Sequence, residues 1–309
     1  MKKNLLIILI IIFSTEIGEA QSIEKIVLDE KDDISGYYLA VKPQTDKIDG
    51  VLILLPGYGQ RAETIFPETK LHNVGYLNNI LTIGFAEGTK LYADKSIQEK
   101  LTKAIEDIIK RYKVDKSKFI LGGFSAGGTV ALRYVELCKQ FPDKFPITPQ
   151  GVFVVDSPID IFTIYQWFED TIENKFSEVA VQEAEWATNL IKKDHGIPRE
   201  NVNFYREINP FAMNKKYGEN EKWLQDLAVR AYHDVDIEWR LVNRNQPVSN
   251  QNYLVTSELI NRLLLMGNKK AEFMQTYQTG FRSSGMRHPH SWSIVNEVEC
   301  IQWIKKIIK

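Results

Sequence analysis

Residues 119–138 read FILGGFSAGGTVALRYVELC. The apolar residues Phe119–Leu121 predict a buried strand, and the apolar residues that recur at helical spacing over Val130–Cys138 predict a helix. Between them, residues 123–127 match the pattern G-x-S-x-G. Its glycines permit a tight strand-to-helix turn that lifts a hydroxyl out of a sheet. Ser125, at the tip of this turn, is therefore the candidate nucleophile.

The rest of the chain alternates short apolar runs with amphipathic stretches, which is typical of βαβ units. Further strands are predicted at residues 23–28, 36–41, 51–55, 80–85, 151–155, 227–233 and 271–277. Helices are predicted at residues 101–112 and 257–266 and in the closing segment. This order predicts an α/β fold with a mostly parallel central sheet flanked by helices.

Strand patterns are missing from residue 158 to about residue 225, where aromatic-rich helices are predicted at 162–174 and 179–195. Long connections over the carboxyl ends of parallel strands commonly form a binding cleft. We therefore expect one α/β domain over residues 21–309 with a helical lid inserted at about 158–225. The aromatic residues of the first helix either face an apolar acyl or aryl group or pack together: Phe162, Tyr165, Trp167 and Phe168.

The order of apolar strand, glycine-containing loop, nucleophile turn, later acid and final histidine resembles the α/β-hydrolase superfamily. The resemblance covers nearly all of the chain beyond about Ile23, and its most specific element is the turn at residues 123–127. It implies a serine hydrolase with a small-molecule acyl substrate and no cofactor. Esters are favoured over peptides, although acyl transfer to an acceptor other than water uses the same residues.

A serine hydroxyl attacks an ester only if an imidazole takes its proton and a carboxylate orients that imidazole. In the resembled family the base lies between the last strand and the last helix. His290 is favoured there, with His288 as the alternative. The acid of the family usually lies a few residues beyond the strand that follows the insertion. This favours Asp236, with Asp234 and Asp156 as alternatives.

The resemblance also points to two backbone donors for the oxyanion. Family members usually begin the loop after the third strand with His-Gly, whereas this chain has Pro56-Gly57. The donors carried over are the backbone N–H of Tyr58 and that of Ala126, the residue after the nucleophile. Backbone donors do not depend on the identity of the side chain, so the missing histidine leaves the mechanism intact.

Two functions of other classes are also compatible with the sequence. The first is a metal-dependent hydrolase, for which the candidate ligands are His233, Asp234, Asp236, His288 and His290, although their spacing matches no standard metal motif. The second is a catalytically silent hydrolase fold used for binding. Arg287, beside the candidate base, either meets a substrate carboxylate or lies solvated at the surface.

The first residues predict export to the periplasm or the medium. Met1-Lys2-Lys3 precedes an apolar run over Leu5–Phe13, and small residues at 18 and 20 suit cleavage after Ala20. The run is shorter than the roughly 20 residues that span a bilayer, so we expect a signal peptide at residues 1–20 and no stable membrane anchor after processing. The formal net charge of −1 offers no basic footprint for nucleic acid. Oligomeric state is left open.

Cys138 and Cys300 both fall in apolar helical patterns, where a buried thiol is the ordinary expectation. An exported protein is also permitted a disulfide between them. The sequence does not decide between these two states.

Overall fold

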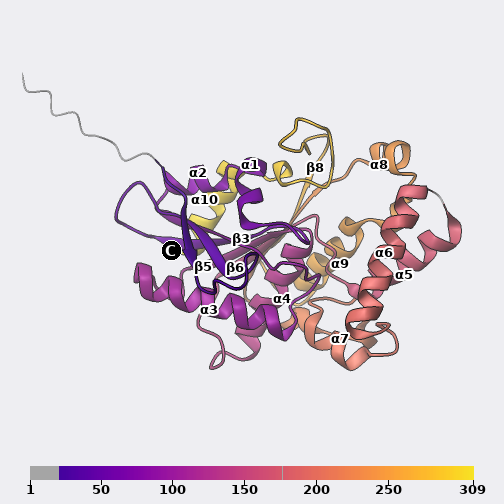
Figure 1. The fold of residues 1–309 in the computed structure, drawn as a ribbon, viewed down its shortest axis with the longest axis horizontal. Coiled ribbons are helices and arrows are strands. Elements are labelled where there is room, and N and C mark those ends of the chain that lie inside the picture. Colours follow the sequence, from indigo (N-terminus) through magenta and orange to yellow (C-terminus); the bar gives the residue numbers. More distant parts are fainter. Residues whose placement is uncertain (1–20, 176) are drawn as a thin grey trace, which may run out of the picture.

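The computed structural model describes residues 21–175 and 177–309, so the predicted signal peptide lies outside the described residues. Its centre is an eight-stranded sheet with the order β1-β2-β4-β3-β5-β6-β7-β8 (Figure 1). The strands are β1 (Glu24–Val27), β2 (Tyr37–Val41), β3 (Gly50–Leu55), β4 (Ile80–Phe85), β5 (Phe119–Phe124), β6 (Gly151–Val155), β7 (Ala228–Asp234) and β8 (Ala271–Thr276). The first two pair antiparallel, and β3 to β8 are mutually parallel. The mostly parallel α/β sheet expected from the sequence is confirmed.

Helices cover both faces of this sheet. They are α1 (Ile65–Glu68), α2 (Leu71–Tyr76), α3 (Lys95–Tyr112), α4 (Ala126–Gln140), α8 (Ile237–Arg244), α9 (Asn252–Leu265) and α10 (Glu297–Ile307) outside the insertion. Figure 1 shows α3 and α4 on one side of the sheet and α2 and α10 on the other. Every residue of β3, β5 and β6 is buried. Both faces of these strands are therefore covered, which explains their continuous apolar sequence.

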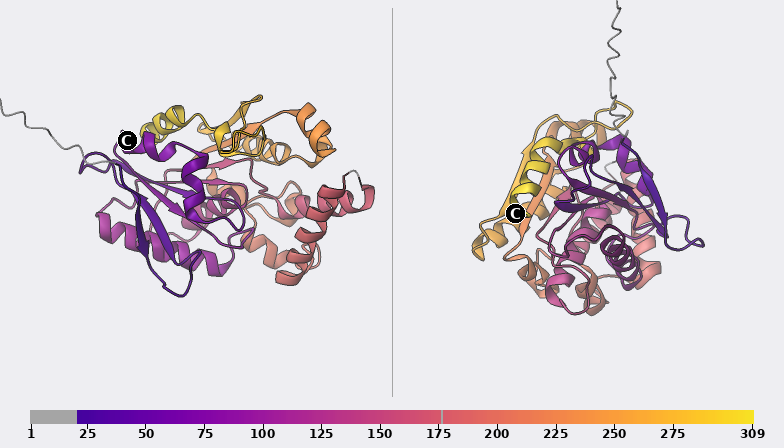
Figure 2. Two further views of the ribbon diagram at one scale, coloured as in Figure 1. Left: turned by 45° about the horizontal axis from the view of Figure 1, so that its top comes forward. Right: turned by 90° about the vertical axis from the view of Figure 1, so that its left-hand side faces the viewer.

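The interval between β6 and β7 is helical, as expected. It contains α5 (Ile161–Asn174), α6 (Glu178–His195) and α7 (Val202–Ile208), which lie together at one end of the molecule (Figures 1 and 2). These helices have an apolar core of their own, to which Phe162 and Tyr165 contribute. The Asp160 side chain caps α5 by accepting the N–H groups of Phe162 and Thr163. The insertion thus has its own apolar core, and its first helix begins at a capping residue.

The two cysteines lie in separate parts of the core. Cys138 on α4 belongs to the apolar cluster on one face of the sheet, and Cys300 on α10 belongs to the cluster on the other face. Both are buried free thiols. Burial raises the pKa of the Cys300 thiol to about 12, so this sulfur stays protonated and unreactive. In this fold the two thiols do not form the permitted disulfide.

None of the helices in the described part of the chain combines the length and apolarity needed to cross a bilayer.

Candidate active site

Ser125 occupies a strained turn between β5 and α4. Its φ and ψ angles are 54° and −126°, a conformation that side-chain-bearing residues rarely adopt. Its N–H donates to the Val155 carbonyl over 3.0 Å, and its own carbonyl accepts the N–H of Gly128 over 3.1 Å. The end of β6 and the first turn of α4 therefore hold this conformation in place.

The flanking glycines are required because backbone segments approach them closely. A Cβ on Gly123 would lie 2.3 Å from the carbonyl of Gly127, and a Cβ on Gly127 would lie 2.1 Å from the Pro56 oxygen. Atoms cannot approach that closely, so any side chain at either position would push β3, β5 and α4 apart. This is the physical reason for the G-x-S-x-G pattern in this chain.

Strain at Ser125 predicts a measurable gain in stability from glycine. Ser125→Gly is expected to unfold with a free energy about 1 kcal/mol higher than Ser125→Ala, because glycine accepts this conformation while alanine does not. Urea denaturation of the two variants provides the comparison. An alanine variant as stable as the glycine variant would show that the turn is relaxed.

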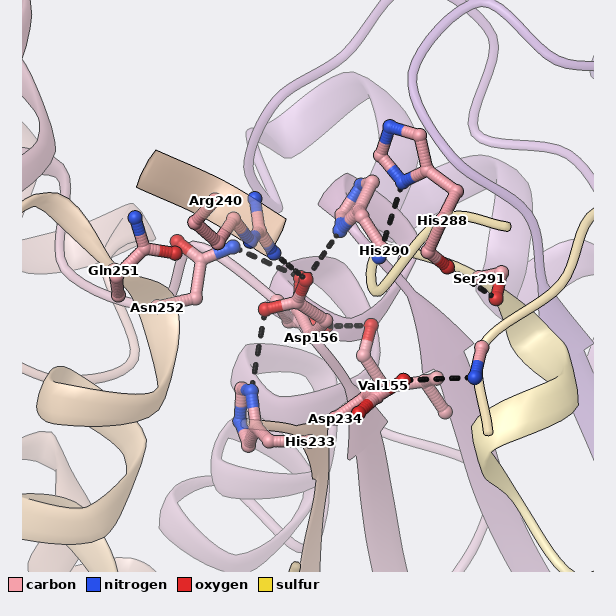
Figure 3. Close-up of polar contacts among 12 residues, drawn as sticks. Val155, Asp156, His233, Asp234, Arg240, Gln251, Asn252, His288, His290 and Ser291 are labelled. Atoms are coloured by element: carbon pink, nitrogen blue, oxygen red, sulfur yellow. Dashed lines mark hydrogen bonds and ion pairs between the residues drawn. The ribbon is translucent and has the colours of Figure 1, made fainter. Parts of the chain in front are cut away.

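His290 and Asp156 form a hydrogen-bonded pair beside this turn. Nδ1 of His290 lies 2.7 Å from Oδ2 of Asp156 (Figure 3). An ionised carboxylate only accepts hydrogen bonds, so Nδ1 carries the proton and Nε2 keeps its lone pair. The His290 ring also packs on the ring of Phe124, the residue before Ser125, with centroids 4.4 Å apart. The pair is thus fixed next to the candidate nucleophile.

Asp156 takes the place that was expected for Asp236. Asp236 instead caps α8 by accepting the N–H of Trp239 over 3.0 Å, and its second oxygen lies 2.7 Å from Nη2 of Arg287. The expectation that Asp236 orients His290 is therefore wrong in this structure. Asp236 caps α8 and pairs with Arg287, and within the described residues it makes no hydrogen bond with His290.

Asp234, the other alternative, holds the loop that follows β8. Its two oxygens accept the backbone N–H groups of Gln278 and Gly280 over 2.8 and 2.7 Å. Nη2 of Arg287 lies 3.0 Å from Asp234 and also pairs with Asp236. Arg287 is therefore committed to two carboxylates of its own chain and is not available to a substrate in this arrangement.

Two further groups hold the Asp156 carboxylate. Nδ1 of His233 lies 3.1 Å from Oδ1, and Nη2 of Arg240 lies 2.9 Å from Oδ2 (Figure 3). Burial on its own would raise the pKa of Asp156, but electrostatic attraction to His290, the charge of Arg240 and the hydrogen bonds from both imidazoles hold this pKa well below its usual value. The carboxylate therefore stays ionised where it contacts His290.

The backbone at Asp156 is also unusual. Its φ angle is 44°, in the left-handed region, and its N–H donates to the Tyr232 carbonyl over 3.0 Å. Strained backbone conformations cluster at functional sites, where surrounding contacts hold them. Ser125 and Asp156 thus leave two neighbouring strands, β5 and β6, through two strained turns at the same edge of the sheet.

His233 supports this carboxylate from the buried side. Its Nε2 lies 2.6 Å from the Thr256 hydroxyl on α9, and its side chain is 1% exposed. Both ring nitrogens are therefore occupied within the protein. His233 does not line the cavity at Ser125, so we treat it as a group that positions Asp156.

His288, the alternative base, supports the loop that carries His290. Its Nδ1 accepts the backbone N–H of His290 over 3.1 Å. Burial, followed by the charges of nearby groups of which Arg282 is the strongest, lowers the pKa of His288 to about 3. The ring is therefore neutral near pH 7. His290, and not His288, contacts the buried carboxylate.

The two expected oxyanion donors are unoccupied. Ala126 is the first residue of α4, so its N–H has no partner within the helix. Tyr58 lies in a loop whose neighbouring N–H groups are satisfied: that of Gly57 by the Gln60 side chain over 2.8 Å and that of Gly59 by the Gly88 carbonyl over 2.8 Å. The N–H of Tyr58 donates to no other described residue.

A cavity of about 390 Å³ opens at this point, and both Ser125 and His290 line it. Insertion residues form an apolar wall: Pro158, Ile164, Trp167 and Phe168. Trp167 and Phe168 thus face the cavity, whereas Phe162 and Tyr165 pack inside the insertion. Three arginines, which sequence reasoning had not selected, also line the cavity: Arg240, Arg244 and Arg282.

The candidate metal ligands do not come together. In residues 21–175 and 177–309, no group of three or more histidine, cysteine or acidic side chains is arranged to hold a metal ion. Instead His233 and His290 bind the same aspartate, and Asp234 and Asp236 share Arg287. The donor atoms proposed for a metal are thus engaged in hydrogen bonds and ion pairs.

No protein-family model and no curated protein matches the sequence. Solved structures do match over most of its length. Carboxyl esterase 2 from Tuber melanosporum is 12% identical, with 96% of this chain and 86% of that chain covered and a TM-score of 0.56. Esterase B from Lactobacillus rhamnosis is 10% identical, with coverage of 93% and 87% and a TM-score of 0.57. This chain has the α/β-hydrolase fold.

An S-formylglutathione hydrolase from Agrobacterium tumefaciens shares the α/β-hydrolase fold with 98% of its own length covered. It is 10% identical, with 96% of this chain covered and a TM-score of 0.53. The present version of the fold departs from the sequence expectation in one respect. The carboxylate beside His290 follows β6, the strand next to the Ser125 strand, and not β7.

Proposed function

We propose that this protein is an exported serine hydrolase that cleaves a small acyl ester through Ser125, His290 and Asp156. The observation that carries the proposal is the hydrogen-bonded pair of Asp156 and His290, which lies beside the strained turn of Ser125 at the cavity that Ser125 and His290 line. Pairing of this kind fixes the imidazole in the tautomer whose Nε2 can accept a proton. The export assignment rests on the sequence of residues 1–20.

In the proposed reaction, Oγ of Ser125 attacks the acyl carbonyl as Nε2 of His290 removes its proton. Asp156 stabilises the imidazolium that forms, and Arg240 and His233 keep this aspartate ionised and in position. The imidazolium then protonates the leaving alcohol, which departs and leaves an acyl-enzyme. Water, deprotonated by His290, attacks this ester, and the acid is released with the proton returned to Ser125.

The negative charge of each tetrahedral intermediate falls on the former carbonyl oxygen. We assign its stabilisation to the free N–H groups of Tyr58 and Ala126, with the positive end of α4 adding to their effect. Loss of one such donor typically costs about 10² to 10³ in rate. The Tyr58 ring contacts Trp186 of α6 with centroids 5.1 Å apart, so the insertion helps to position this loop.

We favour esters over peptides because the three structures compared above include two esterases. The apolar wall of Pro158, Ile164, Trp167 and Phe168 suits a short acyl or aryl group beside the hydroxyl. We propose that α5 and α6 act as the lid over this group. Acyl transfer to an alcohol would use the same residues and the same acyl-enzyme.

If an acyl-enzyme forms, we expect a rapid initial release of the alcohol product. Mixing the protein with p-nitrophenyl acetate should release about one equivalent of nitrophenolate before steady turnover, since acylation by an activated phenyl ester commonly outpaces hydrolysis of the acyl-enzyme. Stopped-flow absorbance measures it, with a parallel sample in chelator. Hydrolysis that is abolished by the chelator would favour a metal-dependent enzyme, and no hydrolysis of any ester in a panel would favour a binding protein.

A further inference from the structure

The cavity at Ser125 carries an excess of positive charge. Three guanidinium groups line it, those of Arg240 and Arg244 from α8 and that of Arg282 from the loop after β8. Glu183 of α6 is the acidic side chain on its lining, and it is exposed to solvent. Arg240 is neutralised by its contact with Asp156 at 2.9 Å. The partners of Arg244 and Arg282 therefore decide whether the cavity keeps a net positive charge.

Arg282 has no carboxylate partner. Within the described part of the chain, no acidic oxygen lies within 4.0 Å of its guanidinium, and no hydrogen bond of that group is found. Its guanidinium carbon lies instead 5.5 Å from the centroid of the Phe124 ring, next to the nucleophile turn. Burial lowers the pKa of Arg282, and the longer-range attraction of Glu68 and Asp156 opposes this shift only in part.

Arg244 also lacks a carboxylate partner among the described residues. Its Nη2 lies 3.1 Å from Nε2 of His288. The low pKa of His288 makes this ring neutral, so the contact leaves the charge of Arg244 without a counter-ion. Both line the cavity, where Arg244 is exposed and Arg282 is half-buried. Together they offer two guanidinium groups without carboxylate partners at the cavity that the apolar wall also lines.

We infer that the substrate is an anionic ester, whose carboxylate, phosphate or sulfate group binds Arg282 and Arg244 while its ester lies at Ser125. This inference rests on the proposed function for the reacting bond. Guanidinium groups pair with planar or tetrahedral oxyanions through two parallel hydrogen bonds, which are stronger than those between neutral groups. The apolar wall of α5 then takes the hydrocarbon part of the same molecule.

Among the described residues no carboxylate is in contact with Arg244 or Arg282, although Glu68 and Asp156 attract Arg282 at longer range. Asp156 is buried beneath the cavity and already bound by three groups, and Asp234 and Asp236 are held by Arg287 on another side of α8. Asn252, which lines the cavity, donates to the Asp156 carbonyl over 2.9 Å. An anion in the cavity can therefore pair with Arg244 and Arg282 without displacing a carboxylate from them.

Binding and turnover test this inference separately. Thermal-shift and calorimetric titrations are made with benzoate, benzyl alcohol and inorganic phosphate. Benzoate should bind, and benzyl alcohol should bind more weakly. The affinity for benzoate should fall by about 10- to 100-fold in Arg282→Gln, because the variant loses hydrogen bonds to a charged partner. Ser125→Ala should bind benzoate as the natural protein does. Phosphate binding as tight as that of benzoate would mean that the anion alone, without the apolar part, is recognised.

The kinetic arm compares matched esters. The ratio of kcat/KM for p-nitrophenyl hemisuccinate to that for p-nitrophenyl butyrate reports a charge on the acyl side, and the ratio for 4-acetoxybenzoate to phenyl acetate reports a charge on the alcohol side. One of these ratios should fall about 10- to 100-fold in Arg282→Gln and recover in part in Arg282→Lys. A change confined to one ratio tells which side of the ester carries the anion.

Arg111→Gln is the matched control for net charge. Arg111 lies on α3 and pairs with Asp107 at 2.9 Å, outside the cavity, so both ratios and benzoate binding should stay as in the natural protein. If Arg111→Gln and Arg282→Gln had equal effects, the net charge of the protein and not a specific site would attract the anion, and the inference would be overturned. Benzoate binding unaffected by Arg282→Gln would overturn it as well. Anion binding without any ester turnover would instead refute the proposed function and leave the anion site standing.

Discussion

Ser125→Ala is expected to lower kcat for ester hydrolysis about 10⁴- to 10⁶-fold, because the variant lacks the oxygen that becomes acylated. The residual rate would come from the oxyanion donors and from binding alone. The free energy of unfolding should change little, since the Ser125 hydroxyl forms no hydrogen bond with the described residues. Steady-state kinetics on a p-nitrophenyl ester, with a urea unfolding curve for each protein, measures both quantities.

Ser157→Ala is the matched control for Ser125→Ala. Ser157 is buried close to the same turn, where its hydroxyl donates to the Val155 carbonyl over 3.3 Å, and it does not line the cavity. We expect its kcat to stay within a few-fold of that of the natural protein. A similar loss of activity in both variants would mean that the turn, and not the Ser125 hydroxyl, limits the reaction.

Asp156→Asn is expected to lower kcat about 10⁴-fold. An asparagine in this position can offer an N–H to Nδ1 of His290 and so favour the wrong tautomer, as occurs when the acid of such a triad is replaced by its amide. The variant should also be less stable, because Arg240 would keep a buried charge without its carboxylate. Kinetics at a temperature well below the measured Tm separates these two effects.

Asp236→Asn supplies the comparison, since asparagine caps helices about as well as aspartate. It should keep the α8 cap to Trp239, lose part of its ion pair with Arg287, and retain kcat within a few-fold. A mild effect of Asp156→Asn together with a severe effect of Asp236→Asn would reassign the acid to the residue that the sequence favoured.

Local pattern explains why the turn and the order of strands were predictable. Gly123 and Gly127 are required because the backbone of the turn and the end of β3 approach them closely. The G-x-S-x-G pattern with its flanking strand and helix is therefore sufficient to predict the turn. Continuous apolar runs in β3, β5 and β6 likewise follow from burial on both faces. The turn and the buried strands thus depend on residues that are close in the chain or on one pattern of apolar residues.

The acid was not predictable by the same means. Asp156, Asp234 and Asp236 all lie at the carboxyl end of a parallel strand or just beyond it, at one edge of the sheet. Which one meets His290 depends on the direction of the imidazole, and that direction is set by the loop bonds of His288 and by the packing on Phe124. None of these contacts has a sequence pattern.

The arginines of the cavity were missed for a similar reason. Arg240 and Arg244 are one turn apart on α8, a spacing that an ordinary solvated helix face also shows. Arg282 lies about 40 residues further along the chain, in a loop that returns to the cavity because the isolated bridge between Phe281 and Arg287 folds it back. Only the tertiary structure brings the three guanidinium groups to one cavity.

Covalent labelling tests most directly whether the Ser125 hydroxyl is activated by the pair of His290 and Asp156. The protein is treated with a fluorophosphonate, and intact mass and peptide mapping locate the adduct. The account predicts one adduct per chain, on the peptide that contains Ser125, absent in Ser125→Ala and formed at least about 10²-fold more slowly in His290→Ala. An adduct on another residue, or labelling of Ser125 at an undiminished rate without His290, would contradict it.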